Sequence, residues 1–149
     1  MAAAKPRPFV DTNVLFSGIH HPDGPPGLIL AEHAQGRILI VVSRQVLSEM
    51  GDTVRRVRPE LLPLLRYFFE SALPEVVQDP PAAEVRAAEA CINHADAPIL
   101  AAAKQSGADC IVSGNTRHFN SRTAECAGIA IYAPRDYWAT LKSAPPDRS

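Results

Sequence analysis

The run Phe9-Val10-Asp11-Thr12-Asn13, close to the N-terminus, most constrains what this chain can fold into. Two apolar residues lead directly into an acid, a hydroxyl and an amide, a pattern typical of a buried parallel strand that ends in turn residues. Open α/β sheets bind their ligands just outside the carboxyl ends of their strands. We therefore expect a first strand over about Arg7–Val10, with Asp11 at the functional edge of the sheet.

Apolar runs and helical periods alternate along the rest of the chain. Strands are expected at Ile38–Val42, Val76–Val77 (an edge), Ile111–Ser113 and Ile129–Tyr132. Helices are expected at Leu28–Gln35, from a Ser43 cap along the stripe Val46–Val57, and at Pro59–Ala72, Ala82–Asn93, Asp96–Ser106 and Pro134–Lys142. This alternation favours an α/β fold with a parallel sheet covered on both faces. Residues 1–143 are expected to form one domain, and residues 144–149 a disordered tail.

Charge and cysteine content narrow the class of protein. Fifteen basic residues against sixteen acidic ones give a net charge of −1, which excludes an overall basic nucleic-acid binder but leaves room for a local basic patch. The three cysteines, Cys91, Cys110 and Cys126, lack metal-finger spacing, so a reducing cytoplasm is favoured over secretion. Cys110 is expected to be a small core residue. No apolar run approaches the length of a membrane span.

Four polar residues fit the description of a divalent-metal site: Asp11, Glu49, Asp96 and Asn115. Hydrolysis of a phosphodiester needs a nucleophilic water and a stabilised leaving oxygen, and one or two divalent cations can supply both. Mg²⁺ and Mn²⁺ prefer oxygen ligands, mainly carboxylates. Asp11 and Asn115 each follow a predicted strand, Glu49 borders the buried stripe of its helix, and Asp96 opens a helix.

Each of these residues also has a purely structural interpretation. Asp11 could form an Asx-turn, Asp96 is a good helix N-cap before Ala97-Pro98, and Glu49 could be a solvated helix residue. Asn115 could hold a left-handed turn position after Gly114. The joint arrangement of the four favours the functional interpretation.

In order along the chain, these motifs resemble the PIN-domain ribonucleases, and among them the VapC-like toxins of bacterial toxin–antitoxin pairs. The resemblance is carried by Val-Asp-Thr-Asn at 10–13, Ser-Glu at 48–49, Asp-Ala-Pro-Ile-Leu-Ala-Ala-Ala at 96–103, Asp-Cys-Ile-Val-Ser-Gly-Asn at 109–115, and His118-Phe119. It implies a three-layer α/β/α sandwich with a mostly parallel sheet and a Mg²⁺ or Mn²⁺ site. It also implies cleavage of single-stranded RNA, often by a homodimer, restrained by a small antitoxin protein.

The resemblance also implies roles for individual residues. The acidic metal-site positions of the family are matched by Asp11, Glu49 and Asp96, while Thr12 and Asn13 match polar residues that shape the site. Ser113 and Asn115 match the turn where many members carry a fourth acid.

Two departures from the family pattern concern the metal. A neutral amide at Asn115 can ligate through its oxygen but adds no charge, so a lower metal affinity is expected. Many members carry a further acid shortly before the Asp96 position, where this chain has Asn93, His94 and Ala95. His94 is interpreted as an exposed loop residue, with a ligand or a proton carrier as the alternative.

Contacts with RNA and with proteins have their own candidates. Arg55 and Arg117 are predicted to bind phosphate, although arginines at a helix end also complement its dipole. The helix Pro59–Ala72 carries a wide apolar arc, and its residues Leu61, Leu65, Phe68 and Phe69 are predicted to form a protein interface.

Two alternative functions stay open. A phosphotransferase could use Asp11 as nucleophile with Lys104 as a later partner, but Asn13 stands where that chemistry needs an acid that transfers a proton. A non-catalytic binding module would keep the fold and the partner surface without the reaction.

Overall fold

A computed structural model describes residues 4–143, and the tail predicted at 144–149 lies outside the described residues. The central sheet has five strands, all parallel, in the order β3-β2-β1-β4-β5. The strands are β1 Pro8–Val10, β2 Val41–Ser43, β3 Glu75–Val77, β4 Cys110–Val112 and β5 Ala130–Tyr132. The predicted parallel α/β fold is confirmed.

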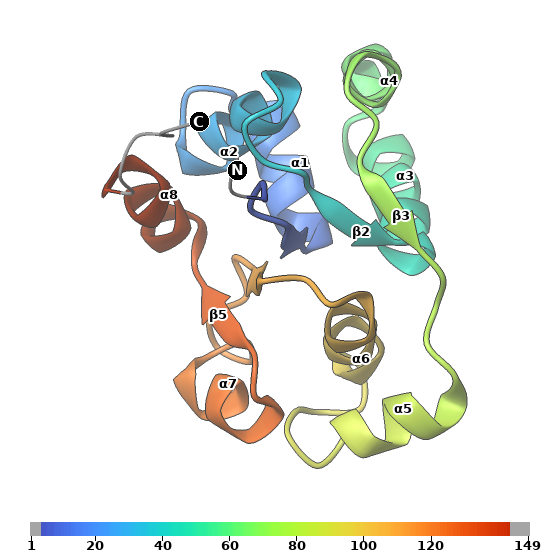
Figure 1. Ribbon diagram of the computed structural model, residues 1–149. Helices are drawn as coiled ribbons and strands as arrows, with labels where there is room; N and C mark the ends of the chain where they lie inside the picture. The colour runs from blue at the N-terminus through green and yellow to red at the C-terminus, as the bar shows by residue number, and fades with distance from the viewer. Residues whose placement is uncertain (1–3, 144–149) are drawn as a thin grey trace.

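Helices cover both faces of this sheet, which makes the fold a three-layer α/β/α sandwich. Figure 1 shows α1 to α4 on one side and α5, α6 and α7 on the other, while α8 packs beside α2. Their bounds are α1 Thr12–His20, α2 Pro25–Ala34, α3 Arg44–Val57, α4 Leu62–Ser71 (after a 3₁₀ turn at Pro59–Leu61), α5 Ala82–Ala88, α6 Ala97–Ser106, α7 Ser121–Ala127 and α8 Pro134–Ser143.

The strand order creates a switch point beside β1. The chain steps from β1 outward through β2 to β3, then returns to the other side of β1 to form β4 and β5. Phe9 is therefore in register with Val41 on one side and with Ile111 on the other. In open α/β sheets, ligands bind at the carboxyl ends of the strands where the order reverses. Asp11 follows β1 and Ser113 follows β4 at this position.

Burial of the strands and of α6 fixes the residues at this edge. The residues of β1, β2 and β4 are all buried, as expected for continuous apolar runs covered on both faces. Six of the ten residues of α6 are buried, mostly small alanines. A helix that is apolar nearly all round belongs in the interior, so α6 packs against the sheet and its N-terminus places Asp96 at this edge.

Two helices were not predicted from the sequence. α1 begins directly after Asp11, where the sequence indicated only turn residues. α7 lies in the segment between β4 and β5, to which no element had been assigned. In addition, α5 ends at Ala88 instead of Asn93, and Val57 at the end of the α3 stripe is 53% exposed.

The predicted interface on α4 needs correction. Leu61 and Leu65 are 9% and 8% exposed and belong to the core, while Phe68 and Phe69 are half-buried. The helix lies against the body of the protein, so most of its wide apolar arc is already covered. The large apolar residues of α4 that do face solvent are Leu64 and Tyr67, at 53% and 70% exposure.

Cysteine chemistry also differs from the expectation. Cys91, after α5, and Cys126, on α7, form a disulfide with a Cα–Cα distance of 5.5 Å, a pair that the spacing of three cysteines did not reveal. Cys110 is buried in β4 as predicted, and burial raises the pKa of its thiol to about 12. None of the helices within residues 4–143 is long and apolar enough to cross a membrane.

Candidate active site

Asp11 is the buried centre of the site. It is 7% exposed and caps α1, and its Oδ1 accepts a hydrogen bond from Thr12 N at 2.8 Å. Its Oδ2 accepts from Ser113 Oγ at 2.8 Å and from Asn13 Nδ2 at 3.2 Å. Burial raises the pKa of Asp11, the hydrogen bonds from Ser113 and Thr12 oppose this rise, and the charges of Glu49 and Asp96 add to it.

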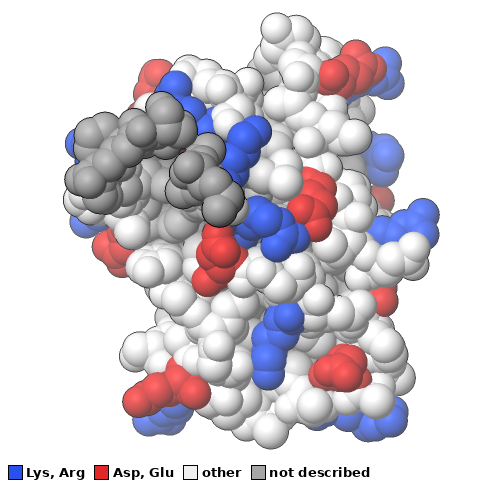
Figure 2. All heavy atoms as spheres, in the orientation of Figure 1, with Lys and Arg blue, Asp and Glu red and all other residues white. Residues whose placement is uncertain are grey.

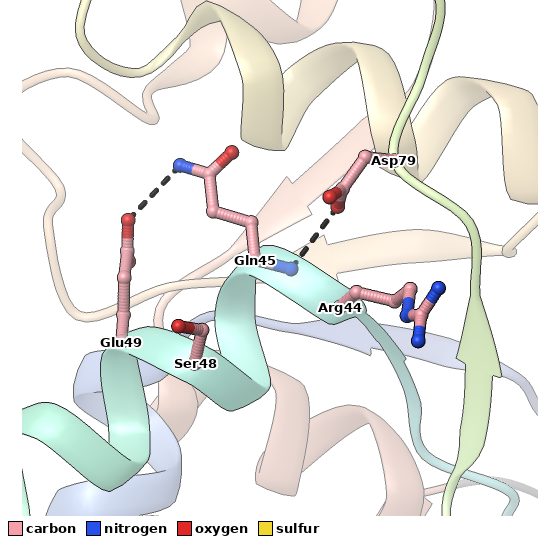
Figure 3. A pocket seen from close by; sticks show the side chains of 5 residues that line it. All are labelled: Arg44, Gln45, Ser48, Glu49 and Asp79. Carbon is pink, nitrogen blue, oxygen red and sulfur yellow. Dashed lines mark hydrogen bonds between the residues drawn. The ribbon is translucent and has the colours of Figure 1, made fainter.

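Glu49 reaches the site from the third helix and is held at both carboxylate oxygens. Thr12 Oγ1 donates to Oε2 at 3.2 Å. Gln45 Nε2, one turn earlier in α3, donates to Oε1 at 2.9 Å (Figure 3). The first turn of α3 is fixed by its own caps, since Ser43 Oγ accepts from Val46 N and Asp79 Oδ1 accepts from Gln45 N. The exposed Glu49 carboxylate is therefore oriented and not merely solvated.

Asp96 occupies the N-cap position of α6, but its side chain makes no capping hydrogen bond. Instead, its Oδ2 accepts from Asn93 Nδ2 at 2.6 Å and lies 2.9 Å from His118 Nδ1. The capping interpretation raised by the sequence does not describe this side chain. Its carboxylate is directed toward the neighbouring loops.

The turn after β4 joins the site through backbone groups. Gly114 N donates to Asn13 Oδ1 at 2.7 Å, and Asn115 N donates to the buried Ser113 Oγ at 3.0 Å. A Cβ on Gly114 would stand 3.0 Å from Asn13 Oδ1, so a larger residue would push this amide aside. The predicted supporting residues Thr12, Asn13 and Ser113 thus link β1, α1 and β4 around Asp11.

The three predicted acids and Asn115 line one pocket of about 400 Å³. Its lining residues are Asp11, Thr12, Asn13, Phe16, Ser17, Glu49, Thr53, Asp96 and Asn115. Within residues 4–143, no three His, Cys, Asp or Glu side chains lie close enough together to form a preformed metal-binding cluster. The donor set nevertheless fits Mg²⁺ or Mn²⁺, because it is made of carboxylate and amide oxygens, which are the ligands that these cations prefer.

A second pocket, of about 520 Å³, adjoins the first at Glu49. It is lined by Arg44, Gln45, Ser48, Glu49 and Asp79, and Figure 3 shows the Arg44 side chain pointing away from Glu49. On the face drawn in Figure 2, Lys and Arg side chains are scattered among Asp and Glu. This agrees with the near-neutral net charge.

Other residues singled out from the sequence lie outside the acidic pocket. Arg55 pairs with Asp52 at 3.2 Å, and Arg117 is exposed on the turn before His118. His94 has an 89% exposed side chain near Glu89, which agrees with an exposed loop histidine. Lys104 is exposed on α6 and does not line the pocket with Asp11.

Sequence reasoning assigned no contact with the acids to three side chains that make one: Gln45, Asn93 and His118. Gln45 stands four residues before Glu49 on one helix, a spacing that places two side chains on the same face. Asn93 stands three residues before Asp96 at a helix start, where side chain and backbone exchange hydrogen bonds. The contact between His118 and Asp96 joins separate parts of the chain and has no local signal.

Comparison with known proteins agrees with this fold. The family model of the PIN domain matches residues 7–117, which is more than half of the chain, and the protein therefore belongs to the PIN domain family. No curated protein sequence is significantly similar to the chain.

Two solved structures share the fold at low sequence identity. PAE2754 from Pyrobaculum aerophilum is 18% identical, with a TM-score of 0.62 over 94% of this chain and 91% of that one. VapBC2 from Rickettsia felis, bound to a DNA fragment from their promoter, is 16% identical, with a TM-score of 0.62 over 85% of this chain and 98% of that one.

Proposed function

We propose that this protein is a metal-dependent endoribonuclease that cleaves single-stranded RNA, and that it is the toxin of a toxin–antitoxin pair. The observation that carries the proposal is the convergence of Asp11, Glu49 and Asp96 on one pocket at the switch point of the sheet. PIN domains are generally nucleases that use divalent metals, and the family assignment supports the same activity here. The likeness to VapBC2 supports the pairing with an antitoxin.

The side chains in and around the pocket have different proposed roles: some bind the metal, some position the acids, and some contact the RNA. When bound, Mg²⁺ or Mn²⁺ supplies a nucleophilic water and stabilises the leaving oxygen. Asp11, Glu49 and Asp96 would hold the cation, with Asn115 able to add an amide oxygen. Ser113 and Asn13 hold Asp11 in place, and Thr12 and Gln45 hold Glu49. Arg117 and Arg55 are proposed to contact phosphates of the RNA, since both are exposed cations two residues along the chain from Asn115 and Thr53 of the pocket lining.

The direct test is cleavage of a labelled single-stranded RNA, with the same RNA in a duplex as comparison. Activity should vanish in excess chelator and return when Mn²⁺ is added. Glu49→Gln should abolish cleavage, whereas Asp52→Asn, one turn further along α3 and paired with exposed Arg55, should retain it.

The possible outcomes separate the candidate functions. Full cleavage in chelator would exclude the metal mechanism. Tight Mn²⁺ binding without cleavage of any RNA would favour the non-catalytic binding module. A phosphorylated Asp11 after incubation with a phosphate donor would favour the phosphotransferase.

An apolar groove supports the antitoxin part of the proposal. A pocket of about 290 Å³ lies between α1, α2 and α4, and its lining is almost wholly apolar, with Ile19, Leu30, Leu64, Tyr67 and Phe68 among its residues. Exposed apolar grooves of this kind mark binding sites for proteins. We expect Tyr67→Lys to weaken binding of the proposed antitoxin, and Val57→Lys, exposed at the end of α3, to leave it unchanged.

The remaining expectations follow from the same proposal. A homodimer would be seen as twice the chain mass in sedimentation at micromolar concentration, and a monomer under those conditions would exclude it. A ribonuclease toxin meets its RNA in the cytoplasm, but the cysteine argument for that location no longer applies, because Cys91 and Cys126 form a disulfide.

A further inference from the structure

The two oxygens of the Asp96 carboxylate have different surroundings. Oδ2 accepts from Asn93 Nδ2 at 2.6 Å and lies 2.9 Å from His118 Nδ1, whereas Oδ1 has no hydrogen-bond partner within the described part of the chain. Asp96 also lines the acidic pocket with Asp11 and Glu49. One oxygen is thus tied to neighbouring side chains, while the other is free to bind a ligand.

The contact with Asp96 fixes the tautomer of His118. A carboxylate oxygen can only accept, so Nδ1 must carry the hydrogen and donate it. With that hydrogen present, Nδ1 cannot accept from the amide of Asn115, whose Nδ2 stands 3.4 Å away. The contact with Asp96 is therefore the hydrogen bond of this nitrogen.

His118 is held where it can make this bond, although its side chain is 45% exposed. The neighbouring Phe119 is 2% exposed and anchors the turn in the core. Backbone hydrogen bonds run from His118 N and Phe119 N to Asn115 O, and Thr123 Oγ1 on α7 donates to His118 O at 2.8 Å. The ring is thus presented to Asp96 by a fixed backbone.

We propose that His118 is a positioning residue for the metal site: it holds Asp96 Oδ2, together with Asn93, so that Oδ1 is presented to the cation. This inference rests on the proposed metal-dependent function. Ligating carboxylates are commonly hydrogen-bonded by outer partners, and loss of such a partner typically lowers metal affinity by about 10-fold to 100-fold. His118 acts through Asp96 and need not touch the metal.

The experiment measures Mn²⁺ affinity by counting free Mn²⁺ with electron paramagnetic resonance in the full-length protein. His118→Ala removes the donor and should weaken binding by about tenfold, the lower end of the range for outer partners because Asn93 still holds Oδ2. His118→Asn keeps an N–H group on Cγ in the place of Nδ1, and it should recover most of the affinity. His94→Ala is the matched control, since His94 is an exposed histidine in the same region that does not contact Asp96.

A structural role alone predicts a different result. If His118 only stabilised the fold, both variants would lower the melting temperature in chelator, whereas positioning predicts an unchanged melting temperature with a changed Mn²⁺ affinity. Unchanged affinity in His118→Ala would overturn the inference, and so would equal losses in the Ala and Asn variants, which would indicate direct ligation by the imidazole. Absence of Mn²⁺ binding to the unmodified protein would instead overturn the proposed function, and this inference with it.

Discussion

Replacing Asp11 by Asn tests whether the charged Asp11 carboxylate destabilises the folded protein without metal and stabilises it when a cation is bound. The substitution keeps the shape of the side chain and the hydrogen bond from Thr12 N. The new amide nitrogen can still donate to Ser113 Oγ, but it cannot accept from Asn13 Nδ2, which lies 3.2 Å from Oδ2. Asn13 cannot turn to compensate, because its own Oδ1 accepts from Gly114 N at 2.7 Å.

The cost of the variant and its dependence on pH follow from these contacts. One lost hydrogen bond costs about 1 kcal/mol, or about 3 °C of melting temperature for a chain of this size. This cost should be visible at acid pH, where Asp11 is neutral. The pKa of Asp11 is raised in the folded protein by burial and by Glu49 and Asp96. The stability that Asp11 contributes is therefore present below its unfolded pKa and is lost as the pH rises through its folded pKa.

In chelator, the free energy of unfolding of Asp11→Asn should consequently rise relative to that of the unmodified protein as the pH rises. With Mn²⁺ at 100 times its dissociation constant, the unmodified protein should gain about 2.7 kcal/mol, and the variant should gain far less. The assay is urea unfolding across pH, with and without Mn²⁺. Equal stabilisation of both proteins by Mn²⁺, or a gap in chelator that widens against the variant with rising pH, would refute the reasoning.

Three further predictions concern separate residues. Asn115→Asp should tighten Mg²⁺ several-fold in calorimetry, because an opposite charge at about 4 Å contributes roughly 1 to 4 kcal/mol before repulsion among the acids is subtracted; unchanged affinity would make Asn115 a turn residue only. Tyr137→Phe should stabilise the protein by about 1 kcal/mol in urea unfolding, because the Tyr137 hydroxyl is buried without a partner among the described residues, and a destabilised variant would argue for a hidden partner. Cys110, with its pKa raised to about 12, should resist iodoacetamide at pH 8 until the protein is unfolded; rapid labelling of the folded protein would contradict its burial.

The parts of the fold that the sequence predicts are those with a strong local signal. Continuous apolar runs such as Ile111–Val112 mark buried parallel strands, and the stripe from Val46 to Val54 marks α3. α1 was missed because Asp11, Thr12 and Asn13 are turn-forming residues that here open a helix. α7 has seven residues and no apolar stripe, and it is fixed from outside by the Asn120 cap and by Cys126.

The residues of the site likewise separate into those with a local sequence signal and those without one. Asp11 was predicted from a strand end and Asp96 from a helix start, and Glu49 was predicted from its place beside the apolar stripe of α3. The partners of these acids depend on tertiary packing. His118 is 22 residues from Asp96 in sequence and meets it only because α6 and the turn after β4 lie side by side. Patterns with a period of two or of 3.6 residues cannot report such a contact.

The disulfide between Cys91 and Cys126 closes a covalent loop of the chain that contains about half of the site residues. The loop spans 35 positions and encloses α6, β4 and the residues Asp96, Ser113, Asn115 and His118, while Asp11 and Glu49 lie outside it. In the chain-entropy description, a loop of this size lowers the conformational entropy of the unfolded chain, which stabilises the folded protein by about 4 kcal/mol. That amount is comparable to a large part of the total stability of a small domain. Reducing surroundings would open this disulfide and remove its contribution to the free energy of unfolding. The redox state of the surroundings therefore affects the stability of the segment from Cys91 to Cys126, which carries Asp96, relative to the part of the protein that carries Asp11.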